Sequence, residues 1–509
     1  MKKLVSLALA IALLLACCTL PALAEEPVTL NMILQTASTY NHGDPNRDMS
    51  VWEAIEKACN VKLNINWISN EGAAEKYSTL LVENKLPDMF TLTNMDTYVS
   101  EGAIMALDPY LDRIPNYMRW LPQAVEASQR YLEDGKLYHI SQLTAYSPAY
   151  TMVYRQDWLD NLDIEKVPET MDEWITVWKA IRDNDANKNG DPNDEIPFID
   201  TTTFNAARGF TLLQSFGVKN NGRWYYDDEG HYSLVYENEH FREFLELMVT
   251  LYQEKLIDAE LFTHTTKDIA TMFNSNTAFS GYQWISRPQN TNTVLAETVP
   301  EVSLQPTTPI KGEAQLIPAR NLPGTSFGIG YQVEKDPAKL DAMLRLIDFM
   351  YSDEGIFLTN YGIEGIHHTM VDGKPVLNEQ ILSDPSFTQA RYAGLICQLF
   401  PGYWSGEQYD QILTGGKDVS EMNAATQSMY KGTVINNEYY YTMPTQLNTP
   451  AMAEYSADIL PKIDELYANC VTGKITVEAF FAGYDALKPH GLQEIIDQAQ
   501  AYYTDLTAE

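Results

Sequence analysis

Residues 185–195 combine oxygen-bearing side chains at every second position with one glycine. Asp185, Asn187 and Asn189 occupy positions one, three and five of an EF-hand-like loop, and Gly190 occupies position six, where such a loop turns sharply. Carboxylate, amide and backbone carbonyl oxygens are the ligands that hard cations prefer. This spacing therefore predicts a structural calcium (Ca2+) site.

The closing end of this loop departs from an EF-hand. Position twelve is Ile196 instead of a bidentate glutamate, and Asp194 and Glu195 come earlier as candidate closing carboxylates. Asp191 is a further candidate ligand through its carbonyl, whereas the role of Asn193 is open. The alternative is a surface turn without metal. Four carboxylates in one turn repel each other unless a cation is present, which favours the metal site.

The N-terminus predicts export from the cytoplasm. Lys2 and Lys3 precede an apolar run at 4–16, and 22–24 has the small-x-small pattern of a signal peptidase site. Cleavage after Ala24 removes residues 1–24 as a signal peptide. A second interpretation stays open, because residues 14–17 resemble a lipobox, and cleavage there leaves a lipid anchor at Cys17.

Composition excludes several functional classes. The formal net charge is -34, so nucleic acid and anionic membranes are poor partners for this surface. Of the five cysteines, cleavage after Ala24 leaves Cys59, Cys397 and Cys470, an odd number at wide spacing that indicates no disulfide framework and no zinc site. At 509 residues, the chain is too long for one hydrophobic core and predicts two or three domains.

The first part of the chain predicts an α/β fold. Strand-like alternation occurs at 28–34 and 61–67, a third strand is predicted at 87–92, and helices are predicted from Ser50 and over 73–84. This alternation predicts a mostly parallel sheet with helices on its faces. Ligands of such sheets bind beyond the carboxyl ends of the strands.

A second unit is predicted to begin near Tyr150. It opens with a strand at 152–154, and Thr170 with Glu173 forms the capping-box pattern of a helix that ends at Ile181. Further helices are predicted at 241–254, 340–351, 452–467 and 479–503, the last broken at 489–491. Residues 288–292 and 318–326 are predicted to be loops or crossings between units.

Four motifs of the chain are Pro-Asp-Met-Phe at 87–90, Tyr-Arg-Gln-Asp-Trp-Leu at 154–159, Pro-Glu-Thr-Met-Asp-Glu-Trp at 168–174, and Tyr-Gly-Ile-Glu-Gly-Ile-His at 361–367. With these motifs the chain resembles extracellular solute-binding proteins of bacterial ABC importers, in the sugar-binding branch and closest to the alginate-oligosaccharide-binding subgroup.

This resemblance implies a two-lobed periplasmic-binding-protein-like fold that closes on a solute by a hinge motion. The expected first lobe comprises 25–148 plus 288–350, and the second comprises 149–287 plus 351–509 with the cation loop. The implied function is capture of an oligosaccharide and its delivery to the permease subunits of an ABC importer. The protein is expected to act as a monomer.

Aromatic side chains stack on sugar rings, which makes loop aromatics the first candidates for the expected cleft. Trp284 follows a strand-like run where the resembling family carries a cleft aromatic, and Tyr403 and Trp404 lie in a glycine-flanked loop. Tyr40 and Tyr331 follow other strand-like runs. Core packing is the alternative role for each ring.

Polar candidates for binding sugar hydroxyls are Asn94 and Asp96 after the third predicted strand, Arg155, and Glu364. For Arg155 the alternative is a structural pair with Asp157. An anionic sugar such as a uronide is compatible with this sequence if Arg155, Arg208 or Arg287 lines the cleft.

Two further functional classes are alternatives for this chain. A secreted polysaccharide-degrading enzyme needs two carboxylates across a cleft, and the sequence selects no such pair. It also lacks a nucleophile elbow, a phosphate-binding glycine loop and a His-Glu-x-x-His motif. We therefore expect no enzyme activity. A receptor for a peptide or another polar solute is the second alternative.

Overall fold

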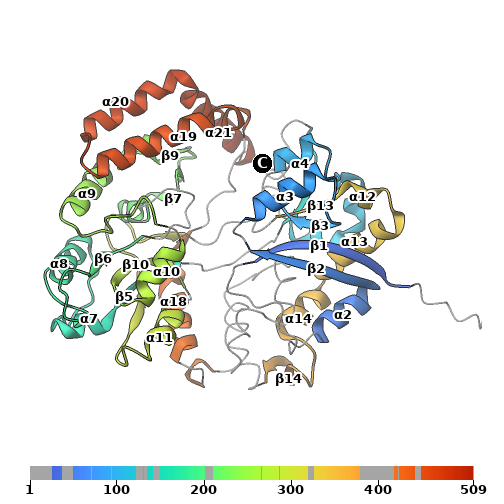
Figure 1. The fold of residues 1–509 in the computed structure, drawn as a ribbon, viewed down its shortest axis with the longest axis horizontal. Coiled ribbons are helices and arrows are strands. Elements are labelled where there is room, and N and C mark those ends of the chain that lie inside the picture. The colour runs from blue at the N-terminus through green and yellow to red at the C-terminus, as the bar shows by residue number, and fades with distance from the viewer. Residues whose placement is uncertain are drawn as a thin grey trace, which may run out of the picture.

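The computed structural model has two lobes, one on each side of Figure 1. It describes residues 26–36, 50–69, 72–92, 95–121, 130, 134–141, 150–200, 210–264, 266–285, 287–318, 326–378, 418–421, 424–441 and 449–507. Each lobe has its own sheet and its own large hydrophobic core. The predicted two-lobed α/β fold is confirmed.

The first lobe is built on a five-stranded sheet. Its strands, in spatial order, are β2 (Val61–Ser69), β1 (Val28–Thr36), β3 (Met89–Thr91), β13 (Ser326–Ile329) and β4 (His139–Ser141). β1 pairs in parallel with β2 and β3, as predicted, and β13 pairs antiparallel with both β3 and β4. Helices α2 (Ser50–Cys59) and α3 (Ala73–Val82) connect the parallel strands.

Alternation along β1 directs its side chains to two cores. Leu30, Met32 and Leu34 pack into the cluster shared with α2 and α13 (Pro337–Met350). Ile33 packs on the other face, in the cluster that contains Tyr77 of α3. Because helices cover both faces, the first sheet is buried like those of other α/β proteins.

The second lobe has a four-stranded sheet. Its order is β11 (Leu304–Thr307), β5 (Tyr150–Arg155), β10 (Ala278–Trp284) and β6 (Ile196–Phe198). β10 pairs in parallel with β6, but β5 has antiparallel neighbours on both sides. This sheet therefore differs from the mostly parallel sheet that was predicted for each lobe. All six residues of β5 are buried, as expected for a central strand.

Helices complete the second lobe. α8 (Met171–Arg182) begins at the predicted capping box, in which Thr170 and Glu173 each accept from the other's backbone N–H. The fully buried rings of Trp158, Trp174 and Trp178 occupy the core beneath it. The other predicted helices are present as α9 (Phe241–Gln253), α13, α19 (Pro450–Val471), α20 (Val477–Leu487) and α21 (Leu492–Thr507).

Long-range pairing corrects the predicted lobe boundaries. β11 pairs with β5, and α11 (Arg287–Leu295) packs on β11, so these elements belong to the second lobe rather than the first. In turn, α14 (Asp353–Tyr361) and β15 (Lys374–Leu377) bury Tyr361 and Leu377 in the first lobe's core. The prediction of a loop at 288–292 is also wrong, because these residues form most of α11.

None of the helices within the described ranges is both long enough and apolar enough to cross a membrane.

Candidate functional site

In the first lobe, one edge of the sheet gathers several strand ends. β1 and β3 are parallel, so Thr36 and Thr91 lie at the same edge. The register pairs Phe327 with Thr91 and Ser326 with Ser141, which brings the start of β13 and the end of β4 to that edge too. This is the carboxyl edge at which α/β sheets bind ligands. In Figure 1, β1 runs toward the second lobe, so this edge faces that lobe.

The second sheet offers a matching edge. Tyr150 at the start of β5 pairs with Trp284 at the end of β10, and β11 ends at this edge with Thr307. Residues 142–149 connect β4 to β5, and residues 319–325 connect Pro318 to β13. A further connection leads from β15 (Lys374–Leu377) of the first lobe to α18 (Ala424–Asn436), which packs on β11 of the second.

Trp284 presents an aromatic surface at this edge. Its half-buried ring lies against Tyr150, with ring centroids 4.7 Å apart and planes inclined by 34°. The hydroxyl of Tyr440 in β16 (Tyr440–Tyr441) donates to the Tyr150 carbonyl at 2.8 Å and fixes that neighbour. A ring that is partly exposed and held by a neighbouring ring is suited to stacking on a sugar face.

Arg155 does not face this edge. It is fully buried, and its guanidinium donates to both carboxylate oxygens of Asp157, at 2.8 and 2.5 Å, and to Asn276 at 2.6 Å. No solute can reach it without unfolding the lobe, so its predicted role in ligand binding is wrong and the structural pair with Asp157 is confirmed. Arg155 is the last residue of β5, at the opposite end from Tyr150.

Tyr331 is also placed away from the facing edge. β13 runs antiparallel to β3, with Ile329 opposite Met89, so Tyr331 follows at the far end of the sheet. Its hydroxyl donates to the Asn84 side chain at 3.3 Å. The prediction that Tyr331 lines a ligand cleft is therefore wrong.

Of the remaining predicted ligand residues, Glu364 is the one whose side chain the structure describes. Glu364 is exposed on the turn between α14 and β14 (His368–Val371) of the first lobe, where its binding role stays a prediction. Asp96 lies in α4 (Met95–Ser100), but its side chain is outside the description. Also outside the described residues are Tyr40, Asn94, Tyr403 and Trp404.

The structure brings polar residues to this edge that the sequence did not single out. Gln283 lies beside Trp284 in β10, and Asn436 of α18 (Ala424–Asn436) donates to the Thr151 hydroxyl at 2.9 Å. Their spacing in the sequence carries no motif. Gln283 is opposite Thr151 in the pairing of β10 with β5, and Asn436 reaches the same Thr151 from a distant helix, so no sequence signal was available.

The predicted cation loop folds as a tight turn around its own oxygens. Asp185 accepts from the backbone N–H groups of Asn189 and Gly190, each at 3.0 Å. The amides of Asn187 and Asn189 contact the two oxygens of Asp194 at 3.0 and 2.6 Å. The side chains thus converge as in a cation-binding loop.

Glu195 closes the loop with one unsatisfied carboxylate oxygen. It is 9% exposed, and its Oε2 is buried with no hydrogen-bond partner. Burial raises the pKa of this carboxyl above its ordinary value, and the charges of Asp194 and Asp185 raise it further. A buried oxygen of this kind needs a partner, and a cation supplies one.

Asp191 has a different environment. Its Oδ1 accepts from the backbone and side-chain nitrogens of Asn193, both at 3.1 Å, on the exposed side of the loop. Among the described residues, no group of three or more His, Cys, Asp or Glu side chains is close enough together to hold a metal ion. Metal binding therefore stays a prediction that depends on the asparagine oxygens as well.

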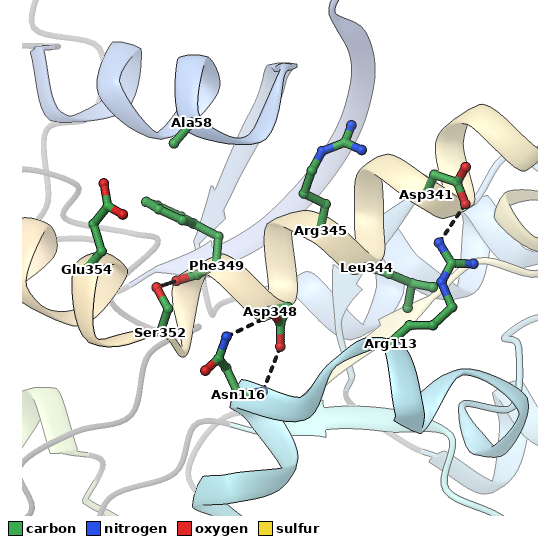
Figure 2. Close-up of a pocket in the computed structure, with 10 residues that line it drawn as sticks. All are labelled: Ala58, Arg113, Asn116, Asp341, Leu344, Arg345, Asp348, Phe349, Ser352 and Glu354. Atoms are coloured by element: carbon green, nitrogen blue, oxygen red, sulfur yellow. Dashed lines mark hydrogen bonds and ion pairs between the residues drawn. The ribbon is translucent and has the colours of Figure 1, made fainter.

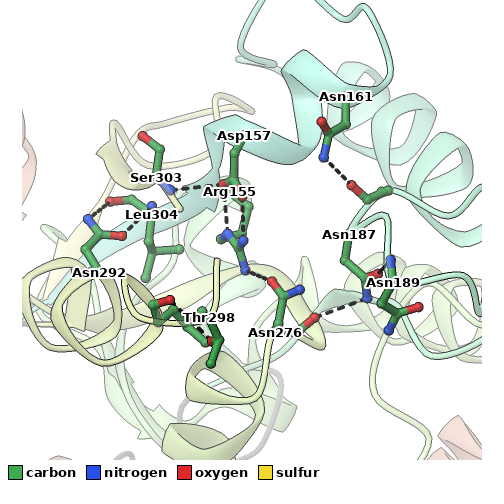
Figure 3. Close-up of polar contacts among 12 residues, drawn as sticks. Arg155, Asp157, Asn161, Asn187, Asn189, Asn276, Asn292, Thr298, Ser303 and Leu304 are labelled. Atoms are coloured by element: carbon green, nitrogen blue, oxygen red, sulfur yellow. Dashed lines mark hydrogen bonds and ion pairs between the residues drawn. The ribbon is translucent and has the colours of Figure 1, made fainter. Parts of the chain in front are cut away.

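Figure 3 shows how this loop is tied to the sheet. The Asn187 side chain donates to the Asn276 carbonyl at 3.2 Å, and the Asn276 side chain accepts from Arg155. Asp157 in turn accepts from the Ser303 backbone N–H at 3.1 Å. The buried ion pair therefore links the loop to β5 and to the segment before β11.

A cavity of 570 Å³ lies on the first lobe, among residues of α2, α13, α14 and α5 (Pro115–Trp120). Figure 2 shows that several of its polar groups pair with each other, whereas Arg345 and Glu354 have no partner among the residues drawn. Arg113 contacts Asp341 at 2.6 Å, and Asp348 accepts from the backbone and side chain of Asn116 at 2.7 and 2.9 Å. Arg345 donates through Nε to the Cys59 carbonyl at 2.6 Å, and Glu354 is exposed.

Comparison with known proteins points to one family. Residues 51–356 match the sequence profile of a family described as bacterial extracellular solute-binding protein. The chain is 25% identical over 258 residues to the fructooligosaccharide ABC transporter substrate-binding protein FusA of Streptococcus pneumoniae, which covers 47% of each chain. It is 30% identical over 155 residues to the polygalacturonan/rhamnogalacturonan-binding protein YtcQ of Bacillus subtilis, covering 29% of this chain and 30% of YtcQ.

Each of these two alignments spans less than half of the relative's length. Among solved structures, the alginate-binding protein AlgQ2 without calcium ion superposes with a TM-score of 0.69 at 22% identity. The superposition covers 94% of this chain and 98% of AlgQ2. At that identity, the similarity shows the fold alone.

Proposed function

We propose, from the premise that the chain belongs to the bacterial extracellular solute-binding proteins, that it captures an oligosaccharide between its lobes and delivers it to an ABC importer. The lobes close on the sugar by a hinge motion, and the closed form docks on the permease. The protein works outside the cytoplasm, either free after cleavage at Ala24 or anchored through Cys17.

The observation that carries this proposal is the Trp284 surface at the facing edge of the second sheet. Trp284 is partly buried against the second lobe's core, supported by Tyr150, and situated where ligands of α/β sheets bind. Aromatic rings of this kind contact the apolar faces of sugars. The names of FusA and YtcQ, which are oligosaccharide- and polysaccharide-binding proteins, support the same ligand class.

A structural calcium ion is part of the proposal. Asp185, Asn187, Asn189, Asp194 and Glu195 would hold it through side-chain oxygens, with Asp191 on the rim. The unpartnered Glu195 oxygen supports this assignment. The ion stabilises the loop, and no bond is made or broken there.

Binding and catalysis are distinguished by what happens to the sugar. The mature protein is titrated calorimetrically with an oligosaccharide panel, and each mixture is then separated by chromatography. We expect one sugar bound per chain and recovered intact. Shortened products would instead show a polysaccharide-degrading enzyme, and binding of peptides without any sugar would show a receptor of another class.

A further inference from the structure

The cation loop contains an asparagine followed directly by a glycine, Asn189-Gly190. In such a pair the backbone nitrogen of the glycine can attack the side-chain amide carbon of the asparagine, because glycine has no Cβ to obstruct the approach. Asn189 and Gly190 are both exposed, and a Cβ built at Gly190 would meet no atom within 4 Å. The groups that would react are therefore open to solvent.

The side chain of Asn189 is folded over the peptide that follows it. Its Oδ1 accepts from the backbone N–H of Asp191 at 2.8 Å, which turns the amide carbon toward the nitrogen of Gly190. This is the Asx-turn conformation that asparagine adopts in tight turns. Negative charge develops on Oδ1 when a nucleophile adds to the amide carbon, and the N–H of Asp191 is already placed to stabilise that charge.

Asp185 contacts the nitrogen that would attack. Its Oδ2 accepts from the N–H of Gly190 at 3.0 Å, and its Oδ1 accepts from the N–H of Asn189 at 3.0 Å. A carboxylate that already holds the N–H of a nucleophile lies at the distance that a general base requires. Removal of this proton converts a weakly nucleophilic amide nitrogen into a reactive one.

The group that would leave is held by Asp194. The Nδ2 of Asn189 donates to Asp194 Oδ2 at 2.6 Å, and the backbone N–H of Asn189 donates to Asn187 Oδ1 at 2.9 Å. The oxygen, the nitrogen and the backbone of the reacting residue are thus all fixed by the loop. Less conformational entropy then has to be lost on the way to a ring, which favours cyclisation.

From this arrangement we infer that Asn189 is a site of spontaneous deamidation, promoted by the folded loop. The nitrogen of Gly190 bonds to Cγ of Asn189 as its proton passes to Asp185, and the Cγ–Nδ2 bond breaks. The proton returns through solvent to the leaving nitrogen, which departs as ammonia. Water then opens the cyclic imide. Opening at Cγ gives an aspartate with the normal backbone, and opening at the backbone carbonyl carbon gives an isoaspartate with a longer backbone.

The two products differ in their effect on the loop. An aspartate at position 189 adds a carboxylate where EF-hand loops carry either aspartate or asparagine. Such loops tune their affinity through the number of charged ligands, so this product should bind calcium about 10-fold more tightly. An isoaspartate displaces Gly190, whose φ of 94° forms the sharp turn, and should bind calcium more weakly. The inference concerns this loop and does not depend on which solute the lobes bind.

The test follows the mature protein by peptide mass spectrometry during incubation with a chelator, because exchange of NH2 for OH raises the mass of the peptide. The chain's other Asn-Gly pair, Asn221-Gly222, is the internal control. It lies at the turn between β7 (Lys219–Asn221) and β8 (Trp224–Tyr226), and Gly222 is buried. In urea, both asparagines should react at similar rates. In the folded protein we expect Asn189 to react about 10- to 100-fold faster than in urea, and Asn221 to react no faster.

Three variants separate the chemical role of Asp185 from a loosened loop. Asp185→Asn keeps the size of the side chain but removes the base, so it should slow the reaction at least about 10-fold. Asp194→Ala loosens the loop and leaves the base in place, so it should slow the reaction less than Asp185→Asn does. Asn189→Gln disfavours the five-membered ring and should show no mass gain at position 189. Thermal melting followed by circular dichroism establishes that each variant is folded.

Calcium supplies a separate readout. Asp185 and Asn189 are proposed calcium ligands, so added calcium should slow the mass gain at Asn189 and leave Asn221 unchanged. If calcium has no effect on either rate, the calcium assignment fails and the deamidation inference stands. If Asn189 reacts no faster in the folded protein than in urea, or as fast in Asp185→Asn as in wild type, the deamidation inference is overturned and oligosaccharide capture is unaffected.

Discussion

The ring of Trp284 lies 4.7 Å from the ring of Tyr150, centroid to centroid, at the edge where the second sheet faces the first lobe. The two residues are direct partners in the pairing of β10 with β5. Tyr150 therefore packs against the indole ring and holds it in place. A ring held in this way loses little conformational entropy when a sugar stacks on it.

Replacing Trp284 with alanine should weaken oligosaccharide binding by about 1–3 kcal/mol, because a central aromatic contact is lost. Calorimetric titration measures the effect. Trp120→Ala is the control, since Trp120 lies in α5 of the first lobe and donates to the Tyr351 carbonyl at 3.0 Å. Equal affinity in Trp284→Ala and wild type would falsify the proposed stacking surface.

Replacing Asp157 with alanine should destabilise the protein by about 3–5 kcal/mol, because it leaves Arg155 buried without its anion. Urea unfolding of the second lobe measures the loss. Asp160→Ala is the control, because Asp160 is exposed and accepts a hydrogen bond from Gln156. Sugar affinity measured below the unfolding transition should be unchanged in Asp157→Ala. A selective loss of affinity would show that Arg155 takes part in ligand binding.

Removing calcium should lower the melting temperature of the mature protein. A ligand present at 100 times its dissociation constant stabilises the folded state by about 2.7 kcal/mol, and a chelator removes this contribution. Asp194→Ala should have the same melting temperature with and without calcium, because the variant lacks a proposed calcium ligand that contacts both loop asparagines. Asp191→Ala, on the rim, should still respond. An unchanged melting temperature of the wild-type protein after addition of the chelator would contradict the metal site.

Acid should destabilise the first lobe through His139. Burial lowers the pKa of this imidazole to about 4, and its Nδ1 has no partner. The unfolded chain takes up the proton near pH 6.5, whereas the folded chain resists it until about pH 4. Stability is therefore intact above pH 6.5 and falls by about 3 kcal/mol between these values.

The difference between wild type and His139→Gln across this pH range isolates the histidine from the carboxylates. His231→Gln serves as the control, because His231 is exposed and contacts Asp227 at 2.7 Å, which raises its pKa. If the free energy of unfolding changes equally with pH in wild type and in His139→Gln from pH 7 to pH 4, His139 does not contribute to the acid destabilisation.

Local sequence determined the elements that depend on neighbours in the chain. The period of two in β1, the capping box at Thr170 and the break before α21 were all predictable, because each arises from contacts within a few residues. The same holds for the oxygen spacing of the cation loop. The motif around Arg155 identified the family but misassigned that residue, since a motif does not reveal burial.

Tertiary structure alone decided which distant residues share an edge. The pairing of β11 with β5 moved one segment to the other lobe, and the antiparallel direction of β13 carried Tyr331 away from the ligand edge. Asn436 donates to the hydroxyl of Thr151 across 285 positions of the chain, a contact that no local pattern records. The physical reason is that strand pairing and burial are set by packing between remote segments, while a sequence pattern reports only short-range preferences.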